Sequence, residues 1–308
     1  VVSTLAPTET LVWDKLILAA GASHAYFGND AWEQFAPGLK TIGDALEIRR
    51  KVLTAFERAE WTEDAAERDA CQTFLVIGGG PTGVELAGAL AEVAFKTMRD
   101  DFRRIDTKKS RVILLEGGGE ILSSYSRKLQ DKAIRSLESM GVHVRVGARV
   151  VRLDGSGVDL ASGERIAAET VLWAAGVAAA PVAASLGVPL DRAGRVPVRP
   201  DLSVEGARDV FVIGDLAVFK DEAGKIRPGV APVAMGQGAR AGANVRADLE
   251  GRPRKDFRYF DKGNMATIGR SHAVLQRGNI QMSGMIAWLA WVFIHLMFLV
   301  SFRSRIVV

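Results

Sequence analysis

Three glycines in the stretch GGGPTG, at residues 78–83, have the spacing G-x-G-x-x-G: Gly78, Gly80 and Gly83. In a strand-turn-helix unit, the first glycine permits a tight turn and the second lets a pyrophosphate approach the backbone. The third lets the helix pack closely on the strand. The apolar residues 74–77 precede the motif, and the sequence VELAGALAE follows it. We therefore expect a dinucleotide site here, although glycine loops also serve as plain turns.

A carboxylate at the end of the next apolar run supports the same interpretation. Glu116 follows residues 112–115, and a carboxylate there can accept hydrogen bonds from the ribose hydroxyls of adenosine. The same charge would repel the additional phosphate of NADP, which favours NAD. Glu116 lies farther along the chain than the usual distance of about 20 residues, which indicates that the charged segment RDDFRRIDTKKS is an insertion. The alternative is an exposed carboxylate at a strand end.

The elements that must position these residues alternate along the chain. Apolar strands are expected at 74–77, 112–115 and 170–174, and helices at 82–95 and 126–140, with Gly141 placed to end the second helix. Strands that alternate with helices predict a parallel sheet in residues 71–177. An amphipathic helix is expected at 41–60, followed by a polar connector at 61–70. The apolar positions of that helix are Ile42, Leu46, Ile48, Val52, Leu53 and Phe56.

Composition limits the classes of function. The chain has 308 residues, of which 48% are hydrophobic and 25% charged, enough for two medium domains or one large one with a well-filled core. Lys and Arg outnumber Asp and Glu by 40 to 36, and the excess is spread along the chain, which disfavours nucleic acid as a partner. Cys71 is the single cysteine, so no internal disulfide or Cys/His zinc spacing can form, and no metal site is expected. We expect Cys71 to be a buried thiol.

Two further apolar runs that end in small residues, LILAAGA and LWAAGV, accompany the motif VFVIGDLA. Together they resemble the two-dinucleotide-binding flavoproteins, in which an NAD-binding domain is inserted into an FAD-binding domain. The resemblance implies that Asp215 hydrogen-bonds the ribityl chain of FAD and that Gly214 adjoins it. It also implies cofactor contacts at Ala20, Gly21 and Gly176.

The C-terminal half narrows the resemblance. The stretches APVAMGQG, FRYFDKGNMATIGRSHAV and AWLAWVFIHLMFLVSFRSR look like the type II NADH:quinone oxidoreductases. Those single-polypeptide respiratory flavoenzymes lie on the membrane surface and pass electrons from NADH through FAD to a quinone without pumping protons. The resemblance implies flavin contacts at Ala231, Val233 and Ala234.

One motif departs from that family. Its members often have A-Q-x-A-x-Q-Q-G, whereas this chain has Pro232 and Gly236 in place of the first two glutamines. Quinone contacts assigned to those glutamines cannot be carried over, and Gln237 remains the candidate.

Two charged residues are implied as catalytic by the same resemblance. Glu85 would lie near the nicotinamide and assist proton traffic, and Lys262 would stabilise charge on the quinone side. The alternatives are a carboxylate that only gains from the helix N-terminus and an exposed loop charge.

The expected fold is α/β, with a Rossmann-like NAD-binding domain inserted into an incomplete FAD-binding domain and an apolar C-terminal membrane-associating region. Residues 1–70 would form part of the FAD domain with a connecting helix, 71–177 the NAD(H) domain, and 178–250 the second part of the FAD domain. Residues 251–308 would form the quinone- and membrane-associating region. Members of the resembled family begin with their own G-x-G-x-x-G loop for FAD, and this sequence has no such loop at its start. We therefore expect a chain that is truncated at both ends.

The apolar residues 285–300 carry His295 as their one potentially ionisable group, which we expect to be packed or interfacial. Sixteen helical residues extend about 24 Å, short of the roughly 30 Å hydrocarbon core. We expect a monotopic element on the cytoplasmic face of the inner membrane, with Trp288, Trp291 and Phe293 at headgroup depth. Arg303 and Arg305 would face phosphates. The alternative is a buried core helix or the interface of a homodimer.

Two other functions stay open. Another two-dinucleotide reductase, of the ferredoxin or disulfide type, would share the nucleotide motifs, but a soluble disulfide reductase has no use for the apolar C-terminal segment. A non-catalytic module that binds NADH without flavin would need only the first glycine motif.

Overall fold

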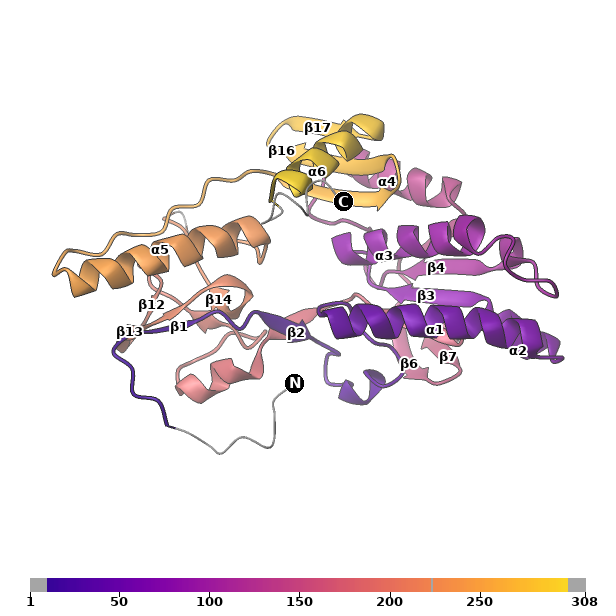
Figure 1. The fold of residues 1–308 in the computed structure, drawn as a ribbon, viewed down its shortest axis with the longest axis horizontal. Helices are drawn as coiled ribbons and strands as arrows, with labels where there is room; N and C mark the ends of the chain where they lie inside the picture. The colour runs from indigo at the N-terminus through magenta and orange to yellow at the C-terminus, as the bar shows by residue number, and fades with distance from the viewer. Residues whose placement is uncertain (1–9, 223, 299–308) are drawn as a thin grey trace. The chain divides into compact units, whose positions relative to one another are not determined.

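The computed structural model describes residues 10–222 and 224–298, which divide between two compact units. The first unit comprises Val1–Ser23 and Val177–Phe260, and the second comprises His24–Gly176 and Asp261–Val308. Each unit contains its own β-sheet structure, and Figure 1 labels the helices and strands of both units.

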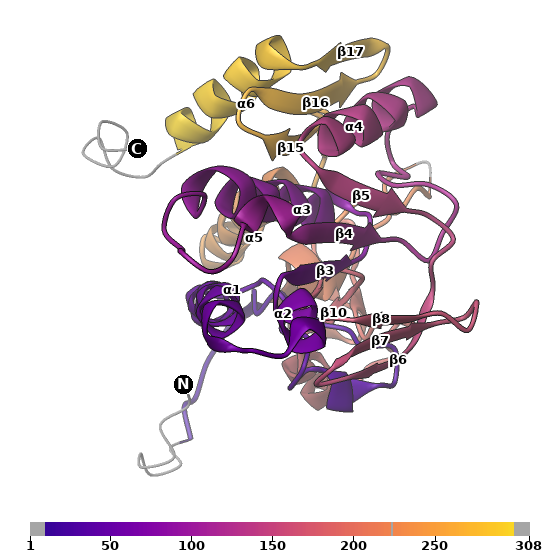
Figure 2. The same cartoon turned by 90° about the vertical axis from the view of Figure 1, so that its right-hand side faces the viewer.

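The second unit is built on a four-stranded parallel sheet with the order β5-β4-β3-β9. Its strands are β3 (Thr73–Ile77), β4 (Arg111–Leu115), β5 (Val142–Arg145) and β9 (Thr170–Trp173). Strand β3 lies between β4 and β9, and all five of its residues are buried. Figure 2 shows β3, β4 and β5 side by side. The parallel sheet expected from the alternating pattern is therefore confirmed.

Alternate residues of β3 face two different layers, because successive side chains of a strand point to opposite faces. Phe74 and Val76 belong to a core shared with α1 (Ile42–Trp61), α3 (Pro81–Glu92) and α4 (Arg127–Ser139). Leu75 and Ile77 belong to a second core shared with an antiparallel sheet. That sheet consists of β6 (Val150–Asp154), β7 (Gly157–Leu160) and β8 (Arg165–Ala167).

Several predicted helices differ from the observed ones in detail. Helix α1 begins where expected because Thr41 and Asp44 form a capping box, but Ile42 and Leu46 are 81% and 58% exposed, so only part of its apolar face is buried. The expected polar connector contains a helix, α2 (Ala65–Cys71), which the Asp64 side chain caps. Helix α3 ends earlier than predicted and continues as a π-helical turn, Val93–Thr97. Gly141, at φ +89°, follows α4 as predicted.

The C-terminal part of the second unit is a meander packed against α3 and α4. Strands β15 (Asn264–Gly269), β16 (His272–Arg277) and β17 (Ile280–Ser283) are antiparallel, and α6 (Met285–Phe298) follows them. Ala266, Ile268 and Val274 join the core that contains Phe74. Among the described residues, no helix combines the length and apolar character needed to cross a membrane. Arg303 and Arg305 lie outside the described residues.

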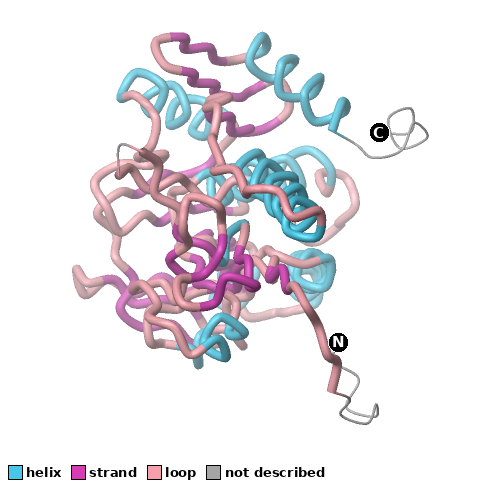
Figure 3. Tube along the Cα trace, turned by 90° about the vertical axis from the view of Figure 1, so that its left-hand side faces the viewer, coloured by secondary structure: helices cyan, strands magenta, loops and turns pink. Residues whose placement is uncertain are grey.

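The first unit contains a three-stranded sheet, β1-β13-β12, and a long helix, α5 (Ala231–Leu249). Strand β1 (Leu16–Leu18) runs parallel to β13 (Ala207–Val212), which is antiparallel to β12 (Ser203–Val204). Two short pairs complete the unit: β2 (Ala22–His24) with β10 (Val177–Ala179), and β11 (Val196–Pro197) with β14 (Ala217–Val218). Loops, pink in Figure 3, join these short strands.

The second unit extends beyond residues 71–177 at both ends. Residues 24–70 and the described residues 261–298 lie in the same compact unit as the glycine motif. For α1 the reason is aromatic packing: the Phe56 ring lies 5.0 Å from that of Phe74 and 5.7 Å from that of Phe102. For the C-terminal part the reason is the close packing of β15 on α3, described below.

Candidate functional site

The first glycine of the motif makes the turn that joins β3 to α3. Gly78 has φ +113°, and a Cβ atom there would lie 2.5 Å from the backbone carbonyl of Ala174. Its amide donates to the Leu115 carbonyl, with 2.7 Å between nitrogen and oxygen. Only glycine fits this position, because both the positive φ and the neighbouring backbone exclude a side chain.

The other two glycines serve different purposes. A Cβ at Gly83 would lie 1.8 Å from the Gly78 carbonyl oxygen, so this glycine lets α3 start directly against the turn. Gly80 has nothing within 4 Å of the position of a Cβ. It is the N-cap of α3 and has no side chain to cap the first-turn amides. The space beside the N-cap is therefore free, and the first amides of a helix, which lack intrahelical partners, suit a phosphate.

Glu116 lies beside the same loop. One carboxylate oxygen, Oε2, accepts a hydrogen bond of 2.6 Å from the Gly79 amide, and Oε1 accepts one of 2.5 Å from the Gly118 amide. The side chain is half-buried. Glu116 thus fixes the glycine loop to the end of β4, and an ionised carboxylate retains lone pairs for a further donor.

A fourth glycine, which the sequence analysis did not single out, brings the C-terminal meander onto α3. A Cβ at Gly88 would lie 1.6 Å from the carbonyl oxygen of Ile268, so β15 touches the helix backbone at this point. The sequence signal is the run of small residues in LAGALA on one helix. This contact sets the distance between α3 and β15.

Glu85 lies three residues before Gly88 and therefore faces the same strand. Its Oε1 accepts a hydrogen bond of 3.2 Å from the Thr267 amide. Burial raises the pKa of the Glu85 carboxyl, while the hydrogen bonds from Thr267 and the charge of His295 oppose that shift. Two turns along the helix, Glu92 accepts a hydrogen bond of 2.7 Å from the Arg270 amide. Both carboxylates join α3 to the β15–β16 hairpin.

Tyr125 is a neighbour of Glu85 that sequence reasoning missed. Its side chain is 5% exposed, and among the described residues its hydroxyl has no hydrogen-bond partner. Burial raises the pKa of Tyr125, and the negative charge of Glu85 raises it further. A phenol alone carries no motif, so no sequence signal could have placed it here.

Lys262 lies in the turn before β15 and is exposed. The Gly263 amide donates to the Asp261 carboxylate at 2.9 Å, which shapes this turn. The Lys262 ammonium lies 5.9 Å from the ring centroid of Phe298, at the end of α6. Among the described residues, no ion pair or hydrogen bond joins Lys262 to Glu85, so the structure places the two in one unit but not in contact.

The first unit contains the second motif. Gly214, at φ +70°, ends the loop after β13, and its amide donates to Oε1 of Gln237 at 2.7 Å. Gln237 is 1% exposed, so this side chain holds the loop to α5 from within the core. A Cβ at Gly214 would lie 3.5 Å from that of Ala234, and one at Gly229 would lie 2.8 Å from Oδ1 of Asp215. The motif therefore adjoins the N-terminus of α5.

The remaining predicted cofactor residues lie near strand ends and helix starts. Ala231 and Val233 belong to the first turn of α5, together with Ala234. Ala20 and Gly21 follow β1, and Gly21 has φ +70°. Gly176 belongs to the second unit, where a Cβ would lie 2.5 Å from the Phe27 ring.

Gly236 occupies a position where glutamine was expected from the resemblance. A Cβ there would lie 3.0 Å from the ring of Phe257, which is 6% exposed and packs edge-on against Phe219 at 5.1 Å. The aromatic ring covers this part of the helix. A longer side chain would have to displace it.

Helix α6 presents apolar side chains to solvent. Ala287 is its one buried residue among the described positions. The exposed residues include Ile286 (67%), Leu289 (54%), Phe293 (65%) and Met297 (53%), which recur at helical spacing on one face. Trp288 and Trp291 are half-buried, and Trp291 stacks on His295 at 3.9 Å.

Two further expectations concern sulfur and metals. Cys71 is completely buried, its thiol donates to Glu169 at 3.3 Å, and burial raises its pKa to about 12, as expected of an unreactive thiol. Within residues 10–222 and 224–298, no group of three or more His, Cys, Asp or Glu side chains is arranged to hold a metal ion.

Sequence comparisons place this chain beside known oxidoreductases. A model of the family described as pyridine nucleotide-disulphide oxidoreductase matches residues 2–238. The chain is 46% identical over 315 residues to type II NADH:quinone oxidoreductase NdhA of Mycobacterium tuberculosis, covering 97% of this chain and 65% of that protein. It is 43% identical over 314 residues to Ndh of the same organism, covering 98% and 66%. The chain thus spans slightly less than two thirds of these relatives.

Structure comparisons agree on the fold. NDH2 of Plasmodium falciparum in complex with NADH superposes with a TM-score of 0.87 at 19% identity, over 96% of this chain and 76% of that one. A ferredoxin reductase of Rhodopseudomonas palustris gives a TM-score of 0.63 at 18% identity, over 85% and 57%. At these identities the likeness concerns the α/β fold alone.

Proposed function

Since the chain belongs to the pyridine nucleotide-disulphide oxidoreductase family, we propose that it forms part of an FAD-dependent enzyme that passes electrons from NADH to a membrane quinone. The main support for the proposal is the position of α3 between the glycine loop and the C-terminal meander. Its N-terminus opens on the glycine loop, and its next turn presents Glu85 to Thr267 of the MATIG stretch. The likeness to the two mycobacterial enzymes extends over the same residues.

The glycine loop fits the pyrophosphate of NADH. Gly80 has free space where a Cβ would lie, and the Thr82 and Gly83 amides in the first turn of α3 can donate to phosphate oxygens, whereas Pro81 has no N–H. Glu116 holds the loop in place and keeps lone pairs for ribose hydroxyls. Its negative charge disfavours an additional phosphate on that ribose, so the proposed dinucleotide is NADH rather than NADPH.

The first unit fits one side of an FAD site. Asp215 lies in the 3-10 turn Gly214–Leu216, beside the N-terminus of α5, where its carboxylate can accept hydrogen bonds from the hydroxyls of a ribityl chain. Gln237 fixes the position of this loop, so we assign it a positioning role. When bound, NADH and FAD supply the hydride and electron chemistry, and the protein binds, orients and excludes water.

Glu85 and Lys262 are proposed to act on protons and charge. A half-buried carboxyl whose pKa is raised can hold and release a proton nearer neutral pH than a free glutamate can. In the complete enzyme, Glu85→Gln should slow one half-reaction roughly 100-fold, and Lys262→Gln should weaken the step on the quinone side. Stopped-flow measurement of each half-reaction tests the two roles, and unchanged rates for both variants would exclude them.

The exposed apolar face of α6 supports association with a membrane surface. Ile286, Leu289, Phe293 and Met297 form an apolar face that suits the interface of a membrane. We propose a peripheral or monotopic enzyme on the cytoplasmic face of the inner membrane, in which a homodimer could bury part of the same face.

The test uses the protein expressed from its complete gene. We expect it to purify with bound flavin, to lose the visible flavin absorbance when NADH is added without oxygen, and to regain it with a soluble quinone. Re-oxidation by ferredoxin but not by quinone would indicate a ferredoxin reductase. Binding of NADH without any flavin, even with FAD in excess, would leave only a nucleotide-binding module.

A further inference from the structure

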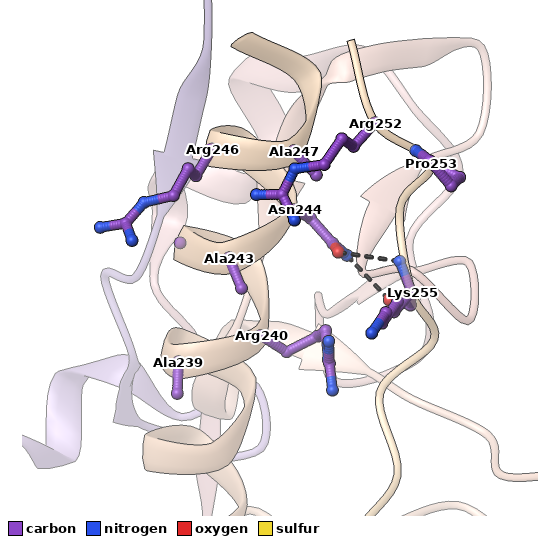
Figure 4. Close-up of a pocket in the computed structure, with 10 residues that line it drawn as sticks. Ala239, Arg240, Ala243, Asn244, Arg246, Ala247, Arg252, Pro253 and Lys255 are labelled. Carbon is purple, nitrogen blue, oxygen red and sulfur yellow. Dashed lines mark hydrogen bonds between the residues drawn. The ribbon is translucent and has the colours of Figure 1, made fainter. Parts of the chain in front are cut away.

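A groove on the first unit lies between α5 and the segment that follows it, away from the Gly214–Asp215 motif. The cavity has a volume of ≈ 540 Å³ and is lined by α5 residues and by residues 252, 253 and 255. This volume lies within the usual range of about 300–1,000 Å³ for sites of small ligands. Figure 4 shows it open to one side of the helix.

The lining carries cations and no acidic residue: Arg240, Arg246, Arg252 and Lys255. In Figure 4 the side chains of Arg240 and Lys255 lie between α5 and the segment that follows it, and Arg252 reaches from that segment back toward the helix. Arg252 forms an exposed ion pair with Glu250. In the described part of the chain, no acidic side chain forms an ion pair with Arg240 or Lys255.

The nearest acidic residue on the helix is already engaged. The carboxylate of Asp248 binds Arg254 at 2.5 Å and Lys15 at 2.7 Å, and its pKa lies well below its usual range because Arg254 hydrogen-bonds it. Asp248 therefore cannot neutralise the groove without giving up these partners. The charges of Arg240 and Lys255 therefore remain available to a ligand, whereas Arg252 shares its charge with Glu250.

Asn244 makes the groove a fixed feature rather than a chance approach of surface side chains. It is 1% exposed, and its side-chain amide donates to the Lys255 carbonyl at 2.9 Å while accepting from the Lys255 amide at 3.0 Å. Both bonds are drawn in Figure 4. This pair of bonds holds the cationic segment at a constant distance from α5.

The floor between the cations is small and apolar. Ala239, Ala243 and Ala247 recur every four residues and therefore share one face of α5, beside Gly242. These short side chains leave room for a ligand to lie against the helix. Two guanidinium groups offer planar pairs of donors that match phosphate oxygens, and the ammonium group adds a mobile point charge.

We propose that Arg240, Arg252 and Lys255 form a binding site for a phosphate-bearing anion with at least two anionic groups. Its source is either a free polyphosphate or the headgroup of an anionic phospholipid. The site is separate from the glycine loop of the second unit, and its occupation does not require electron transfer.

The experiment measures binding of inorganic pyrophosphate to the full-length protein by calorimetry, with NAD⁺ present to block the glycine loop. A second arm measures flotation with phosphatidylcholine vesicles that contain cardiolipin, whose headgroup carries two phosphates. We expect saturable binding in at least one arm, and at least a tenfold loss of affinity in the double variant Arg240→Gln, Lys255→Gln. Loss in the pyrophosphate arm indicates a soluble anion, and loss in the vesicle arm alone indicates a lipid headgroup.

The matched control is the double variant Arg192→Gln, Arg199→Gln, which removes two exposed positive charges from the same unit at residues that do not line the groove. It should retain nearly all of the affinity. An equal loss in this control and in the Arg240→Gln, Lys255→Gln variant would show that only general positive charge matters and would overturn the proposal. Absence of saturable binding in both arms would overturn it as well. Neither result depends on NADH oxidation, so the proposed enzyme activity is tested separately.

Discussion

At the scale of single residues, two buried tyrosines differ in what their hydroxyls contact. Tyr26 is 3% exposed and donates to the Ala36 carbonyl at 2.8 Å, while Tyr125 is 5% exposed and has no partner among the described residues. A buried hydroxyl without a hydrogen bond costs stability, whereas a bonded one contributes to it.

We therefore expect opposite results from the same substitution at these two sites. Tyr26→Phe should lower the free energy of unfolding by about 1–2 kcal/mol, and Tyr125→Phe should leave it unchanged or raise it by up to about 1 kcal/mol. Urea denaturation of both variants provides the comparison. Equal destabilisation by the two would show that Tyr125 has a bonded partner, such as a buried water near Glu85.

Glu85 makes a pH-dependent contribution to the free energy of unfolding, which can be measured without any substrate. Burial raises its folded pKa, so its favourable contribution is complete below the unfolded value of about 4.3 and is lost as pH rises through the folded pKa. Glu85→Gln keeps an oxygen that can accept from Thr267 but cannot ionise. Its stability relative to the parent protein should therefore increase between pH 4 and pH 8. A pH-independent difference in thermal unfolding would contradict the raised pKa.

At the scale of elements, the contact between α3 and β15 depends on one missing side chain. Gly88→Ala would place a Cβ against the Ile268 carbonyl oxygen and force the strand away from the helix. The hydrogen bonds that Glu85 and Glu92 accept from β15 and from Arg270 would stretch with it. We expect a loss of about 2–3 kcal/mol in unfolding free energy.

Gly242→Ala is the control for this change. Gly242 is also helical and is exposed, and a Cβ there would have nothing within 4 Å. Since alanine favours helix over glycine, this variant should gain about 0.5–1 kcal/mol. If Gly88→Ala were as well tolerated, β15 would not pack on α3 as described.

At the scale of the whole molecule, acid should affect the first unit through Arg254. This side chain bonds both Asp248 and Asp201, at 2.5 and 3.1 Å, and is 9% exposed. Its hydrogen bond holds the pKa of Asp248 well below the usual range. Burial alone would raise the pKa of Asp201, but hydrogen bonds from Ser203 and Arg254 outweigh it and lower the value.

A carboxyl group whose pKa is lower in the folded protein stabilises the fold at pH values above its unfolded pKa of about 3.9. That contribution to stability is lost as the pH falls through the folded pKa. The protection of the α5 amides, measured as their exchange rate relative to that of an unstructured peptide at the same pH, should therefore fall below pH 4. Arg254→Gln should lower protection at pH 7 and weaken its dependence on acid. Arg199→Gln, which removes the exposed pair with Glu205, should change neither. A parent protein whose α5 protection does not respond to acid would refute the expectation.

The sequence by itself determined the parts of this protein that follow from local pattern. The alternating apolar runs gave the parallel sheet, the spacing of Gly78, Gly80 and Gly83 located the strand-turn-helix loop, and the resemblance is confirmed at the level of the family. These features depend on the backbone freedom of glycine and on the periodicity of strands and helices, which neighbouring residues encode.

Only the tertiary structure decided which distant segments meet. Gly88 and Ile268 are far apart in the chain, yet their contact puts the C-terminal meander in the same unit as the glycine loop and brings Thr267 to Glu85. The hydroxyl of Tyr125, the burial of Gln237 and the cationic groove beside Asn244 likewise depend on packing between segments that no local period connects. Burial and hydrogen bonding over long sequence separations set these features, because they are properties of the assembled core.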